Sequence, residues 1–219
     1  MNPTKTVLSR LSNTPNGQQP VILLEELQVV YELVPVDITR DAQFEADFVR
    51  VNPNSKIPAY ADNHVTVFES GAILEYLADQ HGTFLAKSGQ ARATVLAWCH
   101  WQVGGLGPSI GQWAHFAAKA ESTEPEDLSS YATDRFLNEA LRLLKVLDNR
   151  LADASYLAGD EYSIADIMSY PWVLGGLDRL KPAAGAALPE LTNIERWLTA
   201  ISARPAVQQA MERLKAATD

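Results

Sequence analysis

The spacing of apolar residues first indicates short strands. Residues 4–11 (TKTVLSRL) and 29–38 (VVYELVPVDI) are rich in β-branched and aromatic side chains, which is typical of strands. Residues 56–61 (KIPAYA) and 64–68 (HVTVF) are shorter runs, and Asp62-Asn63 between them predicts a tight hairpin. The sequence therefore predicts a strand at each of these runs.

Helical periodicity alternates with these strands. Residues 20–28 (PVILLEELQ) and 42–53 (AQFEADFVRVNP) have the apolar spacing of short helices, and Asn52-Pro53 ends the second one. In residues 70–82 the apolar side chains fall on one face, and Gly82 closes the helix. The predicted order βαβαββα suits a small α+β domain in which helices cover a mixed sheet.

Strand patterns end after Gly82, and the rest of the chain is helical in character. Residues 83–89 are expected to be a linker. Residues 90–219 keep a helical pattern with a few breaks, which predicts roughly five helices. The sequence therefore predicts two domains, an α+β domain of residues 1–82 and an all-α domain of residues 90–219.

Composition and charge narrow the function classes. The chain has 219 residues and a net charge of −9 without a block of basic residues, so nucleic acid is not an expected partner. The single cysteine, Cys99, excludes an internal disulfide and a paired-cysteine redox motif. No apolar run is long enough for a signal peptide or a membrane span, which predicts a cytoplasmic protein without a membrane partner. The four histidines lack metal-ligand spacing, so no metal is expected.

Ile57-Pro58 has two interpretations. Proline at the start of a strand is an ordinary edge position. Alternatively, a cis bond before Pro58 would turn the Ile57 backbone outward, leaving its N–H and C=O to pair with a peptide-like ligand.

Glu69-Ser70-Gly71, at the start of the third predicted helix, is also ambiguous. Ser70 fits a plain helix N-cap with Gly71 packed closely beneath it. The same segment fits an anion site, because the first N–H groups of a helix and a serine hydroxyl can bind a carboxylate. Glu69 could then hold a neighbouring ammonium group, so the pair suits the amino-acid end of a zwitterion.

Residues 14–17 (TPNG) join the first strand to the first helix, and their plain interpretation is a turn. A hydroxyl and an amide at a helix start can also stabilise a thiolate. By contrast, Ser163 and Asp166 have capping-box spacing, with Asp in place of the usual Glu, and are predicted to be structural.

Three segments together resemble the cytosolic glutathione transferases, and the resemblance extends over essentially the whole chain. They are residues 52–62 (NPNSKIPAYAD), 67–79 (VFESGAILEYLAD) and 157–167 (LAGDEYSIADI). The resemblance implies a thioredoxin-like N-terminal domain, an all-helical C-terminal domain and a homodimer.

Further segments most resemble the Nu class of that family, which is related to a prion-forming nitrogen regulator. They are residues 14–27 (TPNGQQPVILLEEL), 41–58 (DAQFEADFVRVNPNSKIP) and 101–108 (WQVGGLGP). Members of this class are glutathione-dependent disulfide reductases without a catalytic tyrosine or cysteine. The chain departs from the class at residues 18–20 (QQP), where His-Lys is often found, and this departure removes positive charge near the predicted sulfur site.

The resemblance implies a role for each matching residue. Thr14 and Asn16 would be catalytic and contact the glutathione sulfur. Ile57, ahead of a cis Pro58, would pair with the cysteinyl backbone.

Other matching residues would bind the two ends of the tripeptide or line its surroundings. Glu69 and Ser70 would hold the γ-glutamyl amine and carboxylate. Gln43 would reach the glycyl end. The remaining contacts would come from Lys56 as a charge partner, Gln102 in the adjoining pocket and Arg135 from the helical domain.

The implied function is glutathione-dependent disulfide-bond reduction or glutathione transfer. The thiolate of bound glutathione, the co-substrate, would attack a disulfide, a peroxide or an electrophile. Two alternatives stay open, namely conjugation of glutathione to an apolar electrophile and a non-catalytic glutathione-binding regulatory module. The pair Thr14 and Asn16 discriminates between catalysis and binding, because a pure binder has less use for groups at the sulfur.

Overall fold

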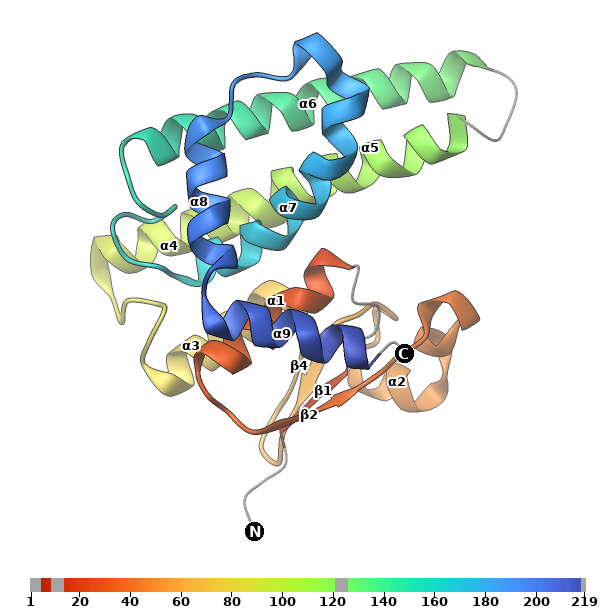
Figure 1. Ribbon diagram of the computed structural model, residues 1–219. Coiled ribbons are helices and arrows are strands. Elements are labelled where there is room, and N and C mark those ends of the chain that lie inside the picture. The colour runs from red at the N-terminus through yellow and green to blue at the C-terminus, as the bar shows by residue number, and fades with distance from the viewer. Residues whose placement is uncertain (1–4, 9–13, 121–125, 218–219) are drawn as a thin grey trace. The chain divides into compact units, whose positions relative to one another are not determined.

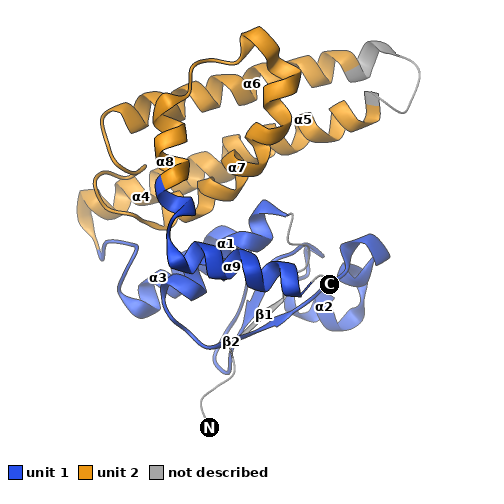
Figure 2. Cartoon of the chain, in the orientation of Figure 1, with its two compact units in different colours: residues 1–87, 200–219 blue, residues 88–199 orange. Residues whose placement is uncertain are grey.

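The computed structural model describes residues 5–8, 14–120 and 126–217 of the chain (Figure 1). The chain forms two compact units, which Figure 2 distinguishes by colour. The N-terminal unit contains residues 1–87 together with 200–219, and the helical unit contains residues 88–199. Residues 200–219 therefore group with the N-terminal unit, although the sequence-based division placed them in the all-α domain. The sequence-based domain boundaries stay a prediction.

A four-stranded mixed sheet forms the centre of the N-terminal unit. Its strand order is β2-β1-β3-β4, with β1 and β2 parallel and the other neighbours antiparallel. The strands are β1 (Lys5–Leu8), β2 (Tyr31–Val34), β3 (Ala59–Ala61) and β4 (Thr66–Phe68). Each lies within one of the runs predicted to be a strand, so the predicted α+β fold with a mixed sheet is confirmed.

The helices of this unit follow the predicted order, with two differences. They are α1 (Pro15–Glu26), the short 3-10 turns η1 (Ile38–Arg40) and η2 (Ala42–Phe44), α2 (Ala46–Val51), α3 (Ser70–His81) and α9 (Pro205–Ala216). The predicted helix start at Pro20 is wrong, because α1 begins at Pro15, whose missing N–H costs nothing at a first helical position. The predicted helix over residues 42–53 is divided, because Glu45 adopts an extended conformation between η2 and α2.

Apolar burial explains why these helices pack as they do. α1 contributes a run of fully buried side chains from Val21 to Leu24, and α3 buries the face predicted from its periodicity, which includes Ile73 and Leu77. α1 packs against both α3 and α9. Burial of a leucine or isoleucine side chain contributes about 2 kcal/mol, so these contacts hold α1 firmly.

Two acidic side chains near the end of α1 pair with arginines of the C-terminal segment. Arg204 Nε and Nη2 donate to the two carboxylate oxygens of Glu26 at 2.5 and 2.8 Å. Arg213 Nε lies 2.8 Å from a Glu25 oxygen that also accepts from the Tyr31 hydroxyl at 2.6 Å. The Arg213 guanidinium lies over the Tyr31 ring. Burial and the bond to Glu25 raise the pKa of Tyr31.

The helical unit contains α4 to α7 and most of α8. These helices are α4 (Gly89–Trp101), α5 (Gly107–Ala120), α6 (Glu126–Ala152), α7 (Ile164–Ala184) and α8 (Thr192–Ser202). A π-helical segment (Gln102–Leu106) joins α4 to α5, and a 3-10 turn, η4 (Gly185–Ala187), follows α7. α5 and α6 run side by side, and α7 packs on α4 (Figure 1). The predicted all-helical character of this part of the chain is confirmed. None of the helices in the described ranges is long and apolar enough to cross a membrane.

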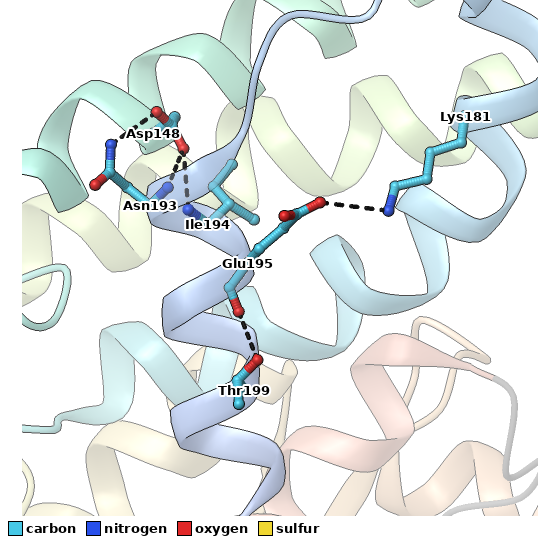
Figure 3. A network of polar contacts seen from close by, with 6 residues as sticks. All are labelled: Asp148, Lys181, Asn193, Ile194, Glu195 and Thr199. Atoms are coloured by element: carbon cyan, nitrogen blue, oxygen red, sulfur yellow. Dashed lines mark hydrogen bonds and ion pairs between the residues drawn. The ribbon is translucent and has the colours of Figure 1, made fainter.

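Two aspartates fix helix starts in this unit. Asp148 of α6 accepts from the backbone N–H groups of Asn193 and Ile194 at 2.9 Å each, and from the Asn193 side chain (Figure 3). This side chain therefore caps α8 from another helix. The same figure shows Lys181 approaching Glu195 on α8, a 3.7 Å ion pair.

The predicted capping box at Ser163 and Asp166 is present at the start of α7. The buried Asp166 carboxylate also accepts from the Leu157 N–H and the Trp197 indole, both at 2.9 Å. Burial raises the pKa of Asp166, although these donors oppose the shift. The motif is structural, as predicted, and it also connects α7 to α8.

The first prediction concerns the pair at the end of α1. Arg204→Leu would leave the Glu26 carboxylate, which is 7% exposed, without the cation that neutralises it. We expect the free energy of unfolding to fall by about 3 kcal/mol, because an uncompensated buried charge is costly. Urea denaturation followed by circular dichroism measures this change.

Arg142→Leu is the matched control, because Arg142 pairs with Glu139 on the exposed surface of α6. Exposed ion pairs contribute little to stability. Indistinguishable stabilities for the two variants would show that the Glu26 pair does not anchor α9 to α1.

Candidate active site

One row of paired residues crosses the whole sheet. It lies at the end of the strands where the segments that carry several of the predicted residues begin or finish. Val34 pairs with Leu8, Leu8 with Ala59, and Ala59 with Phe68. The chain leaves this row at the same end of each strand. The described segments on this side are residues 35–44, 56–58 and 69–70, and the chain is described again from Thr14 after residues 9–13, which lie outside the described ranges. The register therefore collects segments that are far apart in sequence.

The start of α1 presents the predicted catalytic residues. Thr14 is extended and precedes the helix, and its carbonyl accepts from Gly17 and Gln18 N–H groups at 3.0 and 3.2 Å. The Thr14 hydroxyl makes no capping bond to the first turn. Because Pro15 has no N–H, Asn16 supplies the first helical N–H. A helix N-terminus favours an anion, and the predicted thiolate site has this electrostatic basis.

Asn52 shapes the loop that leads into β3. Its side chain is buried; Oδ1 accepts from the Asn54 N–H at 2.9 Å, and Nδ2 donates to the Lys56 carbonyl. The loop ends in a cis bond between Ile57 and Pro58, which confirms the cis conformation considered from the sequence. The Ile57 side chain packs on a buried apolar cluster, while no described residue hydrogen-bonds to its backbone. Among the described residues, the Ile57 N–H and C=O are therefore open to hydrogen bonds with an extended ligand.

Glu69 precedes α3 in a backbone conformation that residues other than glycine rarely adopt. Its φ is 69° and its ψ is 118°, and its side chain is exposed. The Glu69 carboxylate accepts from Asn54 Nδ2 at 3.4 Å, which joins the Ile57-Pro58 loop to the start of α3. The N-cap interpretation of Ser70 is wrong, because Glu69 occupies the N-cap position and the buried Ser70 is the first helical residue. Backbone strain of this kind gathers at functional sites.

A four-residue turn connects β3 to β4 and so fixes the strand that leads to Glu69. Asp62 Oδ1 accepts from the N–H groups of His64 and Val65 at 2.8 and 3.0 Å, and Oδ2 accepts from Tyr60 at 2.9 Å. The predicted hairpin is confirmed. Burial alone would raise the pKa of Asp62, but these donors hold it below its usual range.

Gln43 and Lys56 lie in two of the segments beyond the sheet row. Gln43 is on η2, and its Oε1 is buried without a hydrogen-bond donor among the described residues. Its neighbour Ala42 packs on the same apolar cluster as Ile57, so η2 and the Ile57 loop share a base. The exposed Lys56 ammonium has no described carboxylate within ion-pair distance. The ligand contacts of both residues stay predictions.

Gln102 and Arg135 belong to the helical unit, which is described by itself. Gln102 begins the π-helical segment and is buried, and its Nε2 lies so close to Gly107 that a Cβ there would be 2.6 Å from it. Arg135 lies on the exposed side of α6 and lines an open groove of about 490 Å³ with Tyr131 and other residues. Their predicted roles toward a ligand are untested.

Sequence reasoning missed the two asparagines that organise the site loop. The pattern at Asn52-Pro53 predicts only a helix stop, although an Asn side chain commonly accepts from the backbone N–H two residues on, as Asn52 does here. The contact between Asn54 and Glu69 has no sequence signal, because the residues are fifteen positions apart and meet only through the sheet register. No group of three or more potential metal ligands gathers in the described part of the chain.

Two family models match the chain. Residues 7–79 match "Glutathione S-transferase, N-terminal domain", and residues 108–205 match "Glutathione S-transferase, C-terminal domain". The first match contains most of the sheet and the segments beyond the row of paired residues.

Two named relatives come from Escherichia coli (strain K12). The protein named "Disulfide-bond oxidoreductase YfcG" is 41% identical over 206 residues, covering 90% of this chain and 91% of that protein. "Disulfide-bond oxidoreductase YghU" is 40% identical over 214 residues, covering 90% of this chain and 70% of that protein.

Solved structures of similar proteins contain glutathione. A glutathione transferase from Burkholderia graminis has a TM-score of 0.86 and 36% identity, covers 95% of this chain and 88% of its own, and has two glutathione molecules bound per subunit. A glutathione transferase from Pseudomonas putida has a TM-score of 0.85 and 35% identity. The match covers 95% of this chain and 90% of that chain, and that structure has one glutathione disulfide bound per subunit.

The strain at Glu69 leads to a prediction about stability. Glu69→Gly relieves the positive φ, whereas Glu69→Ala retains it, so we expect the glycine variant to be more stable by about 1 kcal/mol. Both variants lose the same carboxylate, which makes them matched controls for each other. Urea denaturation compares them, and equal stabilities would mean that Glu69 is not strained in solution.

The hairpin at Asp62 leads to a prediction about acid stability. A carboxyl group whose pKa is lowered by folding stabilises the protein above about pH 4, and this contribution is lost as the pH falls through the folded-state value. Asp62→Asn keeps an acceptor for the turn but cannot titrate.

We therefore expect the wild-type protein to lose stability more steeply than Asp62→Asn between about pH 5 and pH 2. Urea midpoints measured across this range give the two slopes. Parallel slopes would mean that the Asp62 contacts do not perturb its ionisation.

Proposed function

The chain belongs to the glutathione S-transferase family, and we propose that it is a glutathione-dependent disulfide-bond reductase. One observation carries the choice of the reacting sulfur. The only cysteine of the chain is Cys99, which is buried in α4. A disulfide reductase without an accessible thiol of its own must take its nucleophile from a bound thiol. The glutathione in similar structures supports glutathione as that thiol.

The tripeptide would bind at the edge of the sheet that gathers the predicted residues. The γ-glutamyl amine would pair with Glu69, and its carboxylate would bind Ser70 and the first N–H groups of α3. The cysteinyl backbone would pair with Ile57 ahead of cis Pro58 as an added strand.

The glycyl end would bind to the N-terminal unit. Gln43 and Lys56 would bind the glycyl carboxylate, since both lie in segments beyond the sheet row and Lys56 carries a positive charge. Gln102 and Arg135 of the helical unit, to which the resemblance also assigns glutathione binding, complete the proposed set of residues.

With the tripeptide held this way, the sulfur would lie at the start of α1. The Thr14 hydroxyl, the Asn16 amide and the helix N-terminus would stabilise the thiolate, which is the reactive form of a thiol. In a chain with a net charge of −9, these neutral donors provide local stabilisation that the overall charge does not.

The reaction would take two exchange steps. The glutathione thiolate attacks one sulfur of the substrate disulfide, forming a mixed disulfide and releasing the other sulfur as a thiolate, which takes up a proton. A second glutathione thiolate then attacks the glutathione sulfur of the mixed disulfide. Glutathione disulfide forms, and the second substrate thiol leaves. The similar structures with two glutathione molecules or one glutathione disulfide bound correspond to the reactants and the product of this sequence.

Peroxides and apolar electrophiles would be attacked by the same thiolate. We also propose a homodimer, which family membership supports, and a cytosolic location, which the single buried cysteine supports. These points extend the proposal and do not alter its chemistry.

Thr14→Ala tests the sulfur site. Removing a hydrogen bond to a charged group typically costs about 1.5–3 kcal/mol, so we expect turnover to fall by roughly tenfold to a hundredfold with the fold intact. The assay follows reduction of a small synthetic disulfide by glutathione, coupled to glutathione reductase. Thr66→Ala, on the exposed β4, is the matched control.

Unchanged turnover in Thr14→Ala would remove Thr14 from the mechanism. A wild-type protein that glutathione stabilises against heating, but that reduces no disulfide, would contradict the reductase function. It would then favour conjugation or a pure binding role.

A further inference from the structure

Residues 18–20 (QQP), where the chain departs from the class it resembles, form part of the first turns of α1. Gln19 and Pro20 are fully buried, whereas Gln18 is half-buried. A fully buried glutamine is unusual, because an amide in an apolar environment is costly unless it is hydrogen-bonded. The hydrogen bonds of the Gln19 side chain therefore indicate why a glutamine is buried here.

Pro20 removes one backbone tether from Asn16. In a regular α-helix the N–H of residue 20 would donate to the carbonyl of residue 16. Proline has no N–H, so this bond cannot form, although α1 continues through Pro20 to Glu26. The regular helical bond from residue 20 therefore does not hold the backbone of the predicted catalytic Asn16.

Gln19 supplies a side-chain tether at the same place. Its Nε2 donates to Asn16 Oδ1 at 3.4 Å, a long hydrogen bond across one helical turn. The two ends of a carboxamide differ, since one accepts and the other donates two hydrogen bonds. With its oxygen turned toward Gln19, the Asn16 side chain has its Nδ2 group on the other side.

We propose that Gln19 is a positioning residue, which orients the Asn16 carboxamide so that its N–H donors, and not its oxygen, meet the glutathione sulfur. This inference rests on the proposed function. The distinction matters chemically, because N–H donors stabilise a thiolate and a carbonyl oxygen repels it. Gln19 does not touch the sulfur in this account and acts only through Asn16.

The Asn16 carboxamide can also adopt the opposite orientation, with its oxygen toward the sulfur, and variants of Gln19 test which orientation is used. Gln19→Leu keeps a side chain of similar size without the donor, so the Asn16 carboxamide can rotate. Gln19→Glu has only acceptors when ionised, so it attracts the Asn16 N–H group and turns the oxygen toward the sulfur. Gln18→Leu removes the neighbouring, half-buried glutamine side chain and is the matched control.

The expected results separate positioning from a merely structural role. Turnover of the synthetic disulfide should fall about threefold to tenfold in Gln19→Leu, the factor that one hydrogen bond between uncharged groups is worth. It should fall further in Gln19→Glu and stay unchanged in Gln18→Leu. The KM for glutathione should change by less than about twofold, because the lost interaction acts on the thiolate and not on tripeptide binding. The ultraviolet absorption of bound thiolate at fixed pH should decrease in parallel with turnover.

A double-mutant cycle with Asn16→Ala decides whether Gln19 acts through Asn16. Once Asn16 is truncated, Gln19→Leu should cause no further loss of turnover. An equal loss in both backgrounds would overturn the proposal, as would a rise in KM with unchanged thiolate absorption. Wild-type protein that binds glutathione without producing thiolate absorption would overturn the proposed function itself, whereas wild-type activity with an unaffected Gln19→Leu would overturn only the role of Gln19.

Discussion

The register of the small sheet is the constraint on which the proposed site depends. Val34, Leu8, Ala59 and Phe68 lie in one row, so every strand delivers its neighbouring loop to the same edge. A slip of one residue in any pairing would reverse the faces of that strand and displace its loop. The side chain of Asn52 shapes the loop before β3, and the hairpin at Asp62, at the opposite end of β3 and β4, fixes the register of these two strands. Chemistry at this edge is therefore a consequence of backbone pairing.

Neutral donors and helix starts provide much of the electrostatics of the proposed site. The chain is acidic overall, and the class-typical positive charge after the TPNG segment is replaced by Gln18-Gln19-Pro20. The starts of α1 and α3 supply oriented N–H groups at no cost in side-chain desolvation. α1 itself is anchored by its buried face and, at its far end, by the pairs of Glu25 and Glu26 with arginines of the C-terminal segment. Packing thus holds the helix whose first turn carries Thr14 and Asn16.

Much of the fold could be predicted from local patterns, and the exceptions have physical causes. The strands, the buried face of α3 and the Ser163 capping box each have a short-range signature. The start of α1 was misplaced because Pro20 resembles a first-turn proline, yet the helix tolerates it inside. The grouping of residues 200–219 with the N-terminal unit comes from contacts between segments far apart in sequence, namely the packing of α9 on α1 and the ion pair between Glu26 and Arg204.

The candidate site was less accessible to sequence reasoning than the fold. The cis bond at Pro58 and the strained Glu69 occur at positions that the motifs indicated. Two hydrogen bonds of the site depend on side-chain geometry that no sequence spacing encodes uniquely. They join Asn54 to Glu69 and Gln19 to Asn16.

The central claim is that the reacting sulfur belongs to bound glutathione and not to the protein. Replacing the only cysteine tests it directly, through turnover of Cys99→Ser with glutathione and a small disulfide. The account predicts turnover equal to that of the wild-type protein, because the buried Cys99 takes no part in the exchange. Loss of turnover in a Cys99→Ser protein that remains folded and still binds glutathione would contradict it.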